Sequence, residues 1–139
     1  MYQKESLGLN EAKGAVEAML QEALKEPQRP VAMAVVDDQG QLIYYARMDG
    51  ATLFNQVMAV RKVSTAAQVG IDTLTFREAL KAMDISFGDF GIIDLTVVQG
   101  GLSVVKPGGR PVLGGIGVSG RMAHEDEAIA RTGLEALKL

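Results

Sequence analysis

Hydrophobic positions recur at steps of three and four in four blocks of the chain, the pattern of amphipathic helices. Asn10 and Thr75 are candidate N-caps for the first and third blocks, because their side-chain oxygens can accept hydrogen bonds from free helical N–H groups. The four predicted helices cover residues 9–24, 51–68, 76–83 and 125–137.

Apolar runs with strand character alternate with these helical blocks. The runs Val31–Val36 and Leu42–Met48 are joined by Asp37-Asp38-Gln39-Gly40, which predicts a β-hairpin. The first run is almost wholly apolar, which favours a central strand covered on both faces. Three further short strands are predicted, separated by glycine-rich turns. They cover residues 95–98, 102–106 and 111–118.

This order of elements predicts an α/β chain of the α+β kind, with one five-stranded antiparallel sheet flanked by helices. The chain has 139 residues, about the length of one ordinary domain, so we expect a single domain over residues 1–139. Hydrophobic residues make up 47% and charged residues 22%, which is typical of a packed globular protein.

Charge and composition argue against several classes of function. The formal net charge is -3 without a basic cluster, so we expect no nucleic-acid or membrane partner. No run approaches the ~20 apolar residues of a membrane span. The chain has no cysteine, which excludes disulfides and thiolate chemistry and favours a cytoplasmic location. The expected partners are a small molecule and further copies of the chain.

Glycines are concentrated in GGIGVSG, residues 114–120. Gly115, Gly117 and Gly120 have the G-x-G-x-x-G spacing of dinucleotide-binding loops. Residues 121–139 predict only one helix and no further parallel strand, so that fold is excluded. Glycine in a strand instead marks the close approach of a helix, a neighbouring subunit or a ligand. The candidate ligand contacts are Gly114, Gly115, Ser119 and Gly120.

Four other side chains are candidates for chemistry. His124, the only histidine, precedes the last helix, where it is either a solvated residue or an acid, base or axial metal ligand. Lys62 lies in the middle of a predicted helix, either solvated or directed into a pocket where it pairs with a carboxylate. Arg47 and Asp49 share one face at the end of the second hairpin strand, where an ion pair would shape the following turn.

Three segments of the chain resemble the haem-binding GlcG/HbpS family, over roughly residues 6–137. They are AVVDDQGQLIYYARMDGA, RKVSTAA, and GGIGVSG followed by HEDEAIARTGLEAL. The resemblance implies a profilin-like fold with a five-stranded antiparallel sheet, assembly into homo-oligomers and, for some members, haem. Histidines that hold haem or iron in family members have no counterpart in the first helix or the hairpin, which leaves His124 as the candidate metal ligand.

We therefore expect a small-molecule-binding protein, with haem or a related tetrapyrrole as the ligand. The predicted pocket lies between the 114–124 turn, the Arg47–Asp49 turn and the helix that carries Lys62. Two alternatives remain open. One is an enzyme that acts on a small organic acid, with His124 or Lys62 as its acid or base. The other is an accessory oligomer without catalysis.

Overall fold

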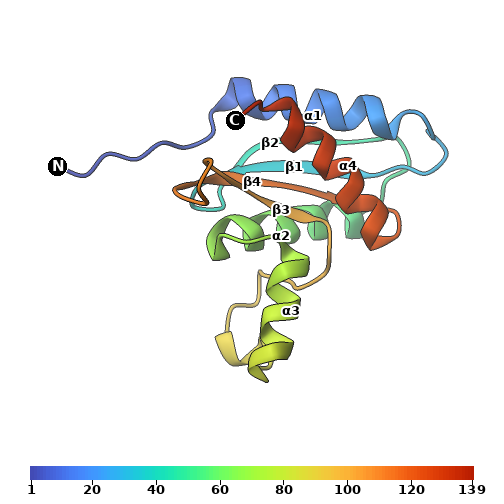
Figure 1. The fold of residues 1–139 in the computed structure, drawn as a ribbon. Coiled ribbons are helices and arrows are strands. Elements are labelled where there is room, and N and C mark those ends of the chain that lie inside the picture. Colours follow the sequence, from blue (N-terminus) through green and yellow to red (C-terminus); the bar gives the residue numbers. More distant parts are fainter.

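A four-stranded antiparallel sheet forms the centre of the structure, a computed structural model that describes residues 1–139. Helices α1 and α4 cover one face of the sheet and α2 covers the other, while α3 projects away from it (Figure 1). The strand order is β2-β1-β4-β3. The elements are α1 (Leu9–Ala23), β1 (Ala32–Asp37), β2 (Leu42–Arg47), α2 (Leu53–Val69), α3 (Thr73–Met83), the 3-10 helix η1 (Phe87–Phe90), β3 (Gly101–Val105), β4 (Val112–Ser119) and α4 (Ala123–Ala136).

The predicted hairpin of β1 and β2 is confirmed. Asp37 Oδ1 accepts hydrogen bonds from the backbone N–H groups of Gln39 and Gln41, both at 2.9 Å, and Gly40 adopts a φ of 87° in the turn. Residues 32–36 of β1 are completely buried because the strand lies between β2 and β4 and is covered on both faces. The apolar run therefore identified a central strand correctly.

The prediction of a fifth strand at residues 95–98 is wrong. The N–H of Thr96 donates to Thr65 Oγ1 of α2 at 2.9 Å, and the N–H of Val98 donates to Thr96 Oγ1 at 3.2 Å. Backbone pairing with β4 starts later, where Val118 N donates to the carbonyl of Gly100. Because side chains satisfy these backbone donors, the segment lies against α2 as a loop and adds no strand to the sheet.

The helix starts also differ from the predicted ones. In α1 and α4 a glutamate at the third helical position reaches back to the residue before the helix: Glu11 accepts from Gly8 N at 3.0 Å and Glu125 from Met122 N at 3.3 Å. These contacts allow α1 to start before Asn10. The N-cap of α3 is Asp72, not Thr75, although its carboxylate accepts from Ser103 N.

Two hydrophobic cores lie on the two faces of the sheet. The larger is built from the sheet, α1 and α4, and the smaller consists mainly of alanine and valine between the sheet and α2. Glycines in β4 permit the close approach of α2: a Cβ on Gly115 would lie 2.8 Å from the carbonyl oxygen of Val63, and one on Gly117 2.8 Å from that of Ala59. No helix is long and apolar enough to cross a membrane.

Candidate functional site

A lysine and an aspartate from different helices form a buried ion pair at one end of the sheet. Lys62 of α2 is 2% exposed and Asp126 of α4 is 1% exposed. Lys62 Nζ lies 3.1 Å from Asp126 Oδ2 and also donates to the carbonyl oxygen of Val118, at 3.0 Å. The pair therefore ties α2 to the end of β4 and the first turn of α4.

Asp126 also organises the turn that connects β4 to α4. Its Oδ1 accepts from the N–H of Arg121 at 2.9 Å and its Oδ2 from that of Gly120 at 3.3 Å. Gly120 has a φ of 151°, and a Cβ there would lie 2.5 Å from the carbonyl oxygen of Pro30. Both the conformation and the space thus require glycine at this position.

Burial shifts the pKa values of both members of the pair. Loss of water disfavours a charged group, so burial lowers the pKa of Lys62 below its ordinary value and raises the pKa of Asp126 above its own. The opposite charge of each partner limits the shift of the other. Burial therefore favours the neutral forms of both groups, whereas their mutual attraction favours the charged forms.

A pocket of about 390 Å³ opens beside the ion pair. The N-terminal half of α2 forms one wall, the β4–α4 turn forms another, and Val98 of the 95–98 loop adds an apolar side chain. The lining residues are Phe54, Asn55, Met58, Lys62, Val98, Ser119, Gly120, Arg121, Met122, Ala123 and Asp126.

The side chain of Ser119 points toward α2 and into this pocket. Ser119 is paired with Ala32 of β1, which packs in the core between the sheet and α2, and residues opposite each other in a sheet share a face. Ser119 is only 5% exposed, yet its hydroxyl makes no hydrogen bond within the chain. The hydroxyl oxygen is not among the fully enclosed atoms of the chain, so it is open to the pocket and available to a ligand.

The first turn of α4 borders the same pocket. Met122 is the residue before the helix, and its side chain forms no capping hydrogen bond. The first N–H groups of a helix have no acceptor within the helix, so those of Ala123 and His124 remain without a side-chain cap. These groups carry the positive end of the helix dipole.

The structure brings three of the predicted site residues together: Lys62, Ser119 and Gly120 all line the pocket. His124 does not line it. Its side chain is exposed on the first turn of α4, beside Ala123, which does line the pocket. The imidazole therefore lies at the rim of the pocket, outside its lining.

Arg47 and Asp49 lie outside the pocket lining, and both side chains are exposed. No ion pair joins them. Arg47 is paired with Ala32, which is paired in turn with Ser119, so Arg47 lies in the same transverse row, two strands from the pocket.

Gly114 and Gly115 lie away from the pocket, because the chain itself occupies the space beside them. A Cβ on Gly114 would lie 2.3 Å from the carbonyl oxygen of Val36 and 2.8 Å from a methyl carbon of Leu7. Gly115 lies against Val63 of α2. The space beside these two glycines is therefore filled by the chain itself.

Sequence reasoning missed Asp126, the partner of Lys62. The residues of α2 buried in the structure include Ala59, Lys62, Val63 and Ala66. Lys62 lies three residues after Ala59 and four residues before Ala66. This spacing places its side chain on the buried face of the helix.

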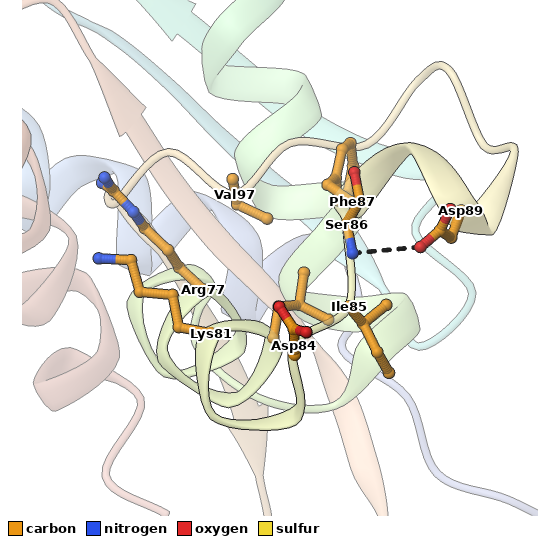
Figure 2. Close-up of a pocket in the computed structure, with 9 residues that line it drawn as sticks. Arg77, Lys81, Asp84, Ile85, Ser86, Phe87, Asp89 and Val97 are labelled. Carbon is orange, nitrogen blue, oxygen red and sulfur yellow. Dashed lines mark hydrogen bonds between the residues drawn. The ribbon is translucent and has the colours of Figure 1, made fainter.

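A second, larger pocket of about 540 Å³ lies beside the projecting helix α3, between α3, η1 and the 95–98 loop (Figure 2). Arg77 and Lys81 point to one side of it, while Asp84 lies below and Asp89 accepts from the N–H of Ser86 at 3.2 Å. None of the predicted site residues lines this pocket. Its cations and carboxylates are balanced in number and exposed, so it presents no buried chemistry.

The fold and the site define the class of the protein: an α+β protein with an antiparallel sheet between helical layers and a buried lysine–aspartate pair beside a pocket. The model of the family described as haem degrading protein HbpS-like matches residues 7–135. The chain belongs to this family.

Solved structures agree with this assignment. HbpS is 32% identical, with a TM-score of 0.85 over 99% of this chain and 94% of that chain. A double mutant of Streptomyces reticuli HbpS is 30% identical, with a TM-score of 0.86 over 99% and 90%. A PduOC:heme complex is 23% identical, with a TM-score of 0.82 over 94% of both chains, and shows likeness of fold alone. No curated protein sequence matches the chain.

Proposed function

We propose that this protein binds haem or a related tetrapyrrole in the pocket between α2 and α4. The observation that carries the proposal is the lining of this pocket, in which apolar side chains surround a buried ion pair and an unpartnered hydroxyl. Membership of a family described as haem-degrading, and a solved relative of the same fold that is a haem complex, support the choice of ligand.

The donors around the pocket fit a haem. Thioether and imidazole groups are axial ligands of haem iron, and the sulfur atoms of Met58 and Met122 belong to residues that line the pocket. His124 lies one residue beyond the lining residue Ala123. Phe54 and Val98 supply apolar contact for a macrocycle. When bound, haem would supply redox and oxygen chemistry at its iron.

Titration of the purified protein with hemin tests this proposal. We expect a saturable shift of the Soret band at one haem per chain, and a changed band in His124→Ala, Met58→Leu or Met122→Leu, whichever side chain ligates the iron. Met83→Leu is the matched control, because Met83 lies at the end of α3, outside the pocket. Absence of a saturable shift in the wild type would remove the tetrapyrrole.

The homo-oligomer that the resemblance implies is part of the proposal. Phe54 and Met122 at the pocket rim are 69% and 64% exposed, and Leu53 beside them is 69% exposed. A neighbouring copy that covered these side chains would also enclose the pocket. Light scattering on the eluted protein measures the mass of the particle, and a monomer at micromolar concentration would contradict this part. The cytoplasmic location stays a prediction.

The buried pair supports a second candidate, an enzyme that moves a proton on a small organic acid. In its neutral form Lys62 can accept a proton from a carbon next to a carbonyl group, while the electron pair moves onto the carbonyl oxygen. Asp126 would hold the resulting ammonium group. The lowered pKa of Lys62 increases the neutral fraction that this step needs.

Proton exchange into pyruvate tests the enzyme directly. In D₂O the wild type should accelerate the loss of the methyl signal in the proton NMR spectrum. The double variant Lys62→Met/Asp126→Asn, which removes the base without leaving a buried charge, should not. Lys25→Met, an exposed lysine paired with Glu22, serves as the control. An accessory oligomer without catalysis predicts no acceleration by any of these proteins.

A further inference from the structure

We infer that the pocket between α2 and α4 recognises a carboxylate group, held by the Ser119 hydroxyl and the first N–H groups of α4. The inference rests on the proposed function for the location of the ligand and adds its chemical class. The ligand is an amphipathic carboxylic acid, whose apolar part lies against Phe54, Met58 and Met122.

Ser119 supplies the first observation. Its residue is 95% buried, its side chain faces the pocket, and its hydroxyl has neither donor nor acceptor within the chain. The hydroxyl oxygen itself is open to the pocket, since the one fully enclosed side-chain atom without a partner is Oγ of Ser103. The partner of the Ser119 hydroxyl therefore has to come from outside the chain, as water or as a ligand that enters the pocket. A carboxylate oxygen is an acceptor for this O–H.

The start of α4 supplies the second observation. The helix is 14 residues long, and its N-cap, Met122, offers no acceptor to the first turn. Residues that cap helices are normally Ser, Thr, Asp or Asn, because their oxygens accept from these N–H groups. An anionic ligand at this end would take the place of the missing cap and interact favourably with the helix dipole.

The fixed charges around the site do not oppose the binding of one negative charge. Three cations and three carboxylates surround the β4–α4 turn, and their formal charges cancel. Asp126 is satisfied by Lys62 and two backbone N–H groups, so it does not compete for the remaining donors. The six groups are Lys62 with Asp126, Arg29 with Glu26 and Glu125, and Arg121, whose guanidinium donates only to backbone carbonyls.

This balance favours a carboxylate over a phosphate. No unpaired ammonium or guanidinium group faces the pocket to neutralise a second charge, since Lys62 is paired and Arg121 is bonded to carbonyls. The hydroxyl of Ser119 and the free N–H of Ala123, both residues of the pocket lining, supply one donor for each oxygen of a planar monoanion. The carboxylate can belong to a tetrapyrrole propionate or to a free aryl or alkyl acid.

Two pairs of probes distinguish these sources. Hemin is compared with hemin dimethyl ester, which lacks the free propionates, and phenylacetate is compared with phenylacetamide. We expect the acid of at least one pair to bind about tenfold more tightly than its uncharged analogue. Where phenylacetate binds, the amide resonances of Ala123 and His124 should shift in nitrogen–proton correlation spectra.

Two substitutions test the residues. Ser119→Ala should weaken the acid about tenfold and leave the ester or amide unchanged, whereas Ser103→Ala, the same change at an unbonded serine of β3, should alter neither. Met122→Asp places a carboxylate at the N-cap and should abolish binding of the acid, while Met83→Asp, the same change at the end of α3 outside the pocket, should retain it. The Met122→Asp variant adds a good N-cap, so its loss of binding would not reflect unfolding.

The outcomes separate the two proposals. Equal binding of hemin and its ester, unaffected by Ser119→Ala, overturns the carboxylate site and leaves the tetrapyrrole in place. Binding of phenylacetate that depends on Ser119, without any binding of hemin, supports the carboxylate site and overturns the tetrapyrrole. Failure of all four probes to bind overturns both.

Discussion

Lys62 Nζ lies 3.1 Å from Asp126 Oδ2 although the two residues are 64 positions apart in the sequence. Both side chains are almost completely enclosed, so the contact holds two charges away from water. Such a pair contributes little net stability when intact, but removal of one partner leaves an uncompensated buried charge. The pair connects α2 to α4 and forms one wall of the pocket.

Lys62→Met should destabilise the protein by about 3–5 kcal/mol in urea unfolding, because the carboxylate of Asp126 loses its counter-charge. The double variant Lys62→Met/Asp126→Asn should recover part of this loss, since the asparagine is neutral and its single oxygen can still accept from the N–H of Arg121. Lys25→Met, at an exposed site, should stay within about 0.5 kcal/mol of the wild type. A double variant no more stable than Lys62→Met would contradict a cost based on charge.

The ion pair between Arg29 and Glu125 should make stability depend on pH. Arg29 Nη2 lies 2.6 Å from Glu125 Oε1, and this hydrogen bond holds the pKa of Glu125 below its ordinary value. The unfolded chain then binds more protons just below the ordinary pKa, so stability present at neutral pH is lost as the pH falls through the folded pKa.

Glu125→Gln removes this titration. Its melting temperature should lie below that of the wild type at pH 7, and the difference should shrink between pH 5 and about pH 3. Glu135→Gln is a matched control on the exposed side of α4, without an ion pair. A difference for Glu125→Gln that stayed constant over this range would show that the carboxylate charge is not the cause.

Gly117→Ala should destabilise the protein by about 1–3 kcal/mol, because its Cβ would lie 2.8 Å from the carbonyl oxygen of Ala59 and force α2 away from β4. Gly14→Ala is the same substitution on α1, where a Cβ would meet nothing within 4 Å. There we expect a gain of about 0.5–1 kcal/mol from helix propensity. Urea unfolding of both variants gives the comparison, and a neutral Gly117→Ala would refute the close approach.

Thr65→Val should loosen the 95–98 loop. The Oγ1 of Thr65 accepts from Thr96 N at 2.9 Å, and valine has no acceptor to replace it. Hydrogen exchange at the Thr96 amide should accelerate about tenfold, the effect expected for the loss of one hydrogen bond. Thr65→Ser retains the hydroxyl and should preserve protection. Unchanged exchange in Thr65→Val would mean that another contact holds the loop.

Local patterns were sufficient for the hairpin and for the class of fold. The apolar runs at residues 31–36 and 42–48 and the turn between them require only short-range information, since a strand pattern and turn residues are properties of adjacent positions. The prediction of a fifth strand was wrong because it, too, used only short-range information. Residues 95–98 have the composition of a strand, but their backbone donors bind hydroxyl groups, one of them from Thr65, which is remote in sequence.

The residues of the candidate site, too, were predicted in part from the sequence and in part became visible only in the structure. The sequence by itself singled out Lys62, Ser119 and Gly120 and determined that the glycines of β4 make room for something. Only the tertiary structure decided that α2 fills the space beside Gly115 and Gly117, that Asp126 is the partner of Lys62, and that Ser119 is left unpartnered. Residue types and their spacing limit which local conformations are possible, but which side chains meet across 64 positions depends on how the helices pack on the sheet.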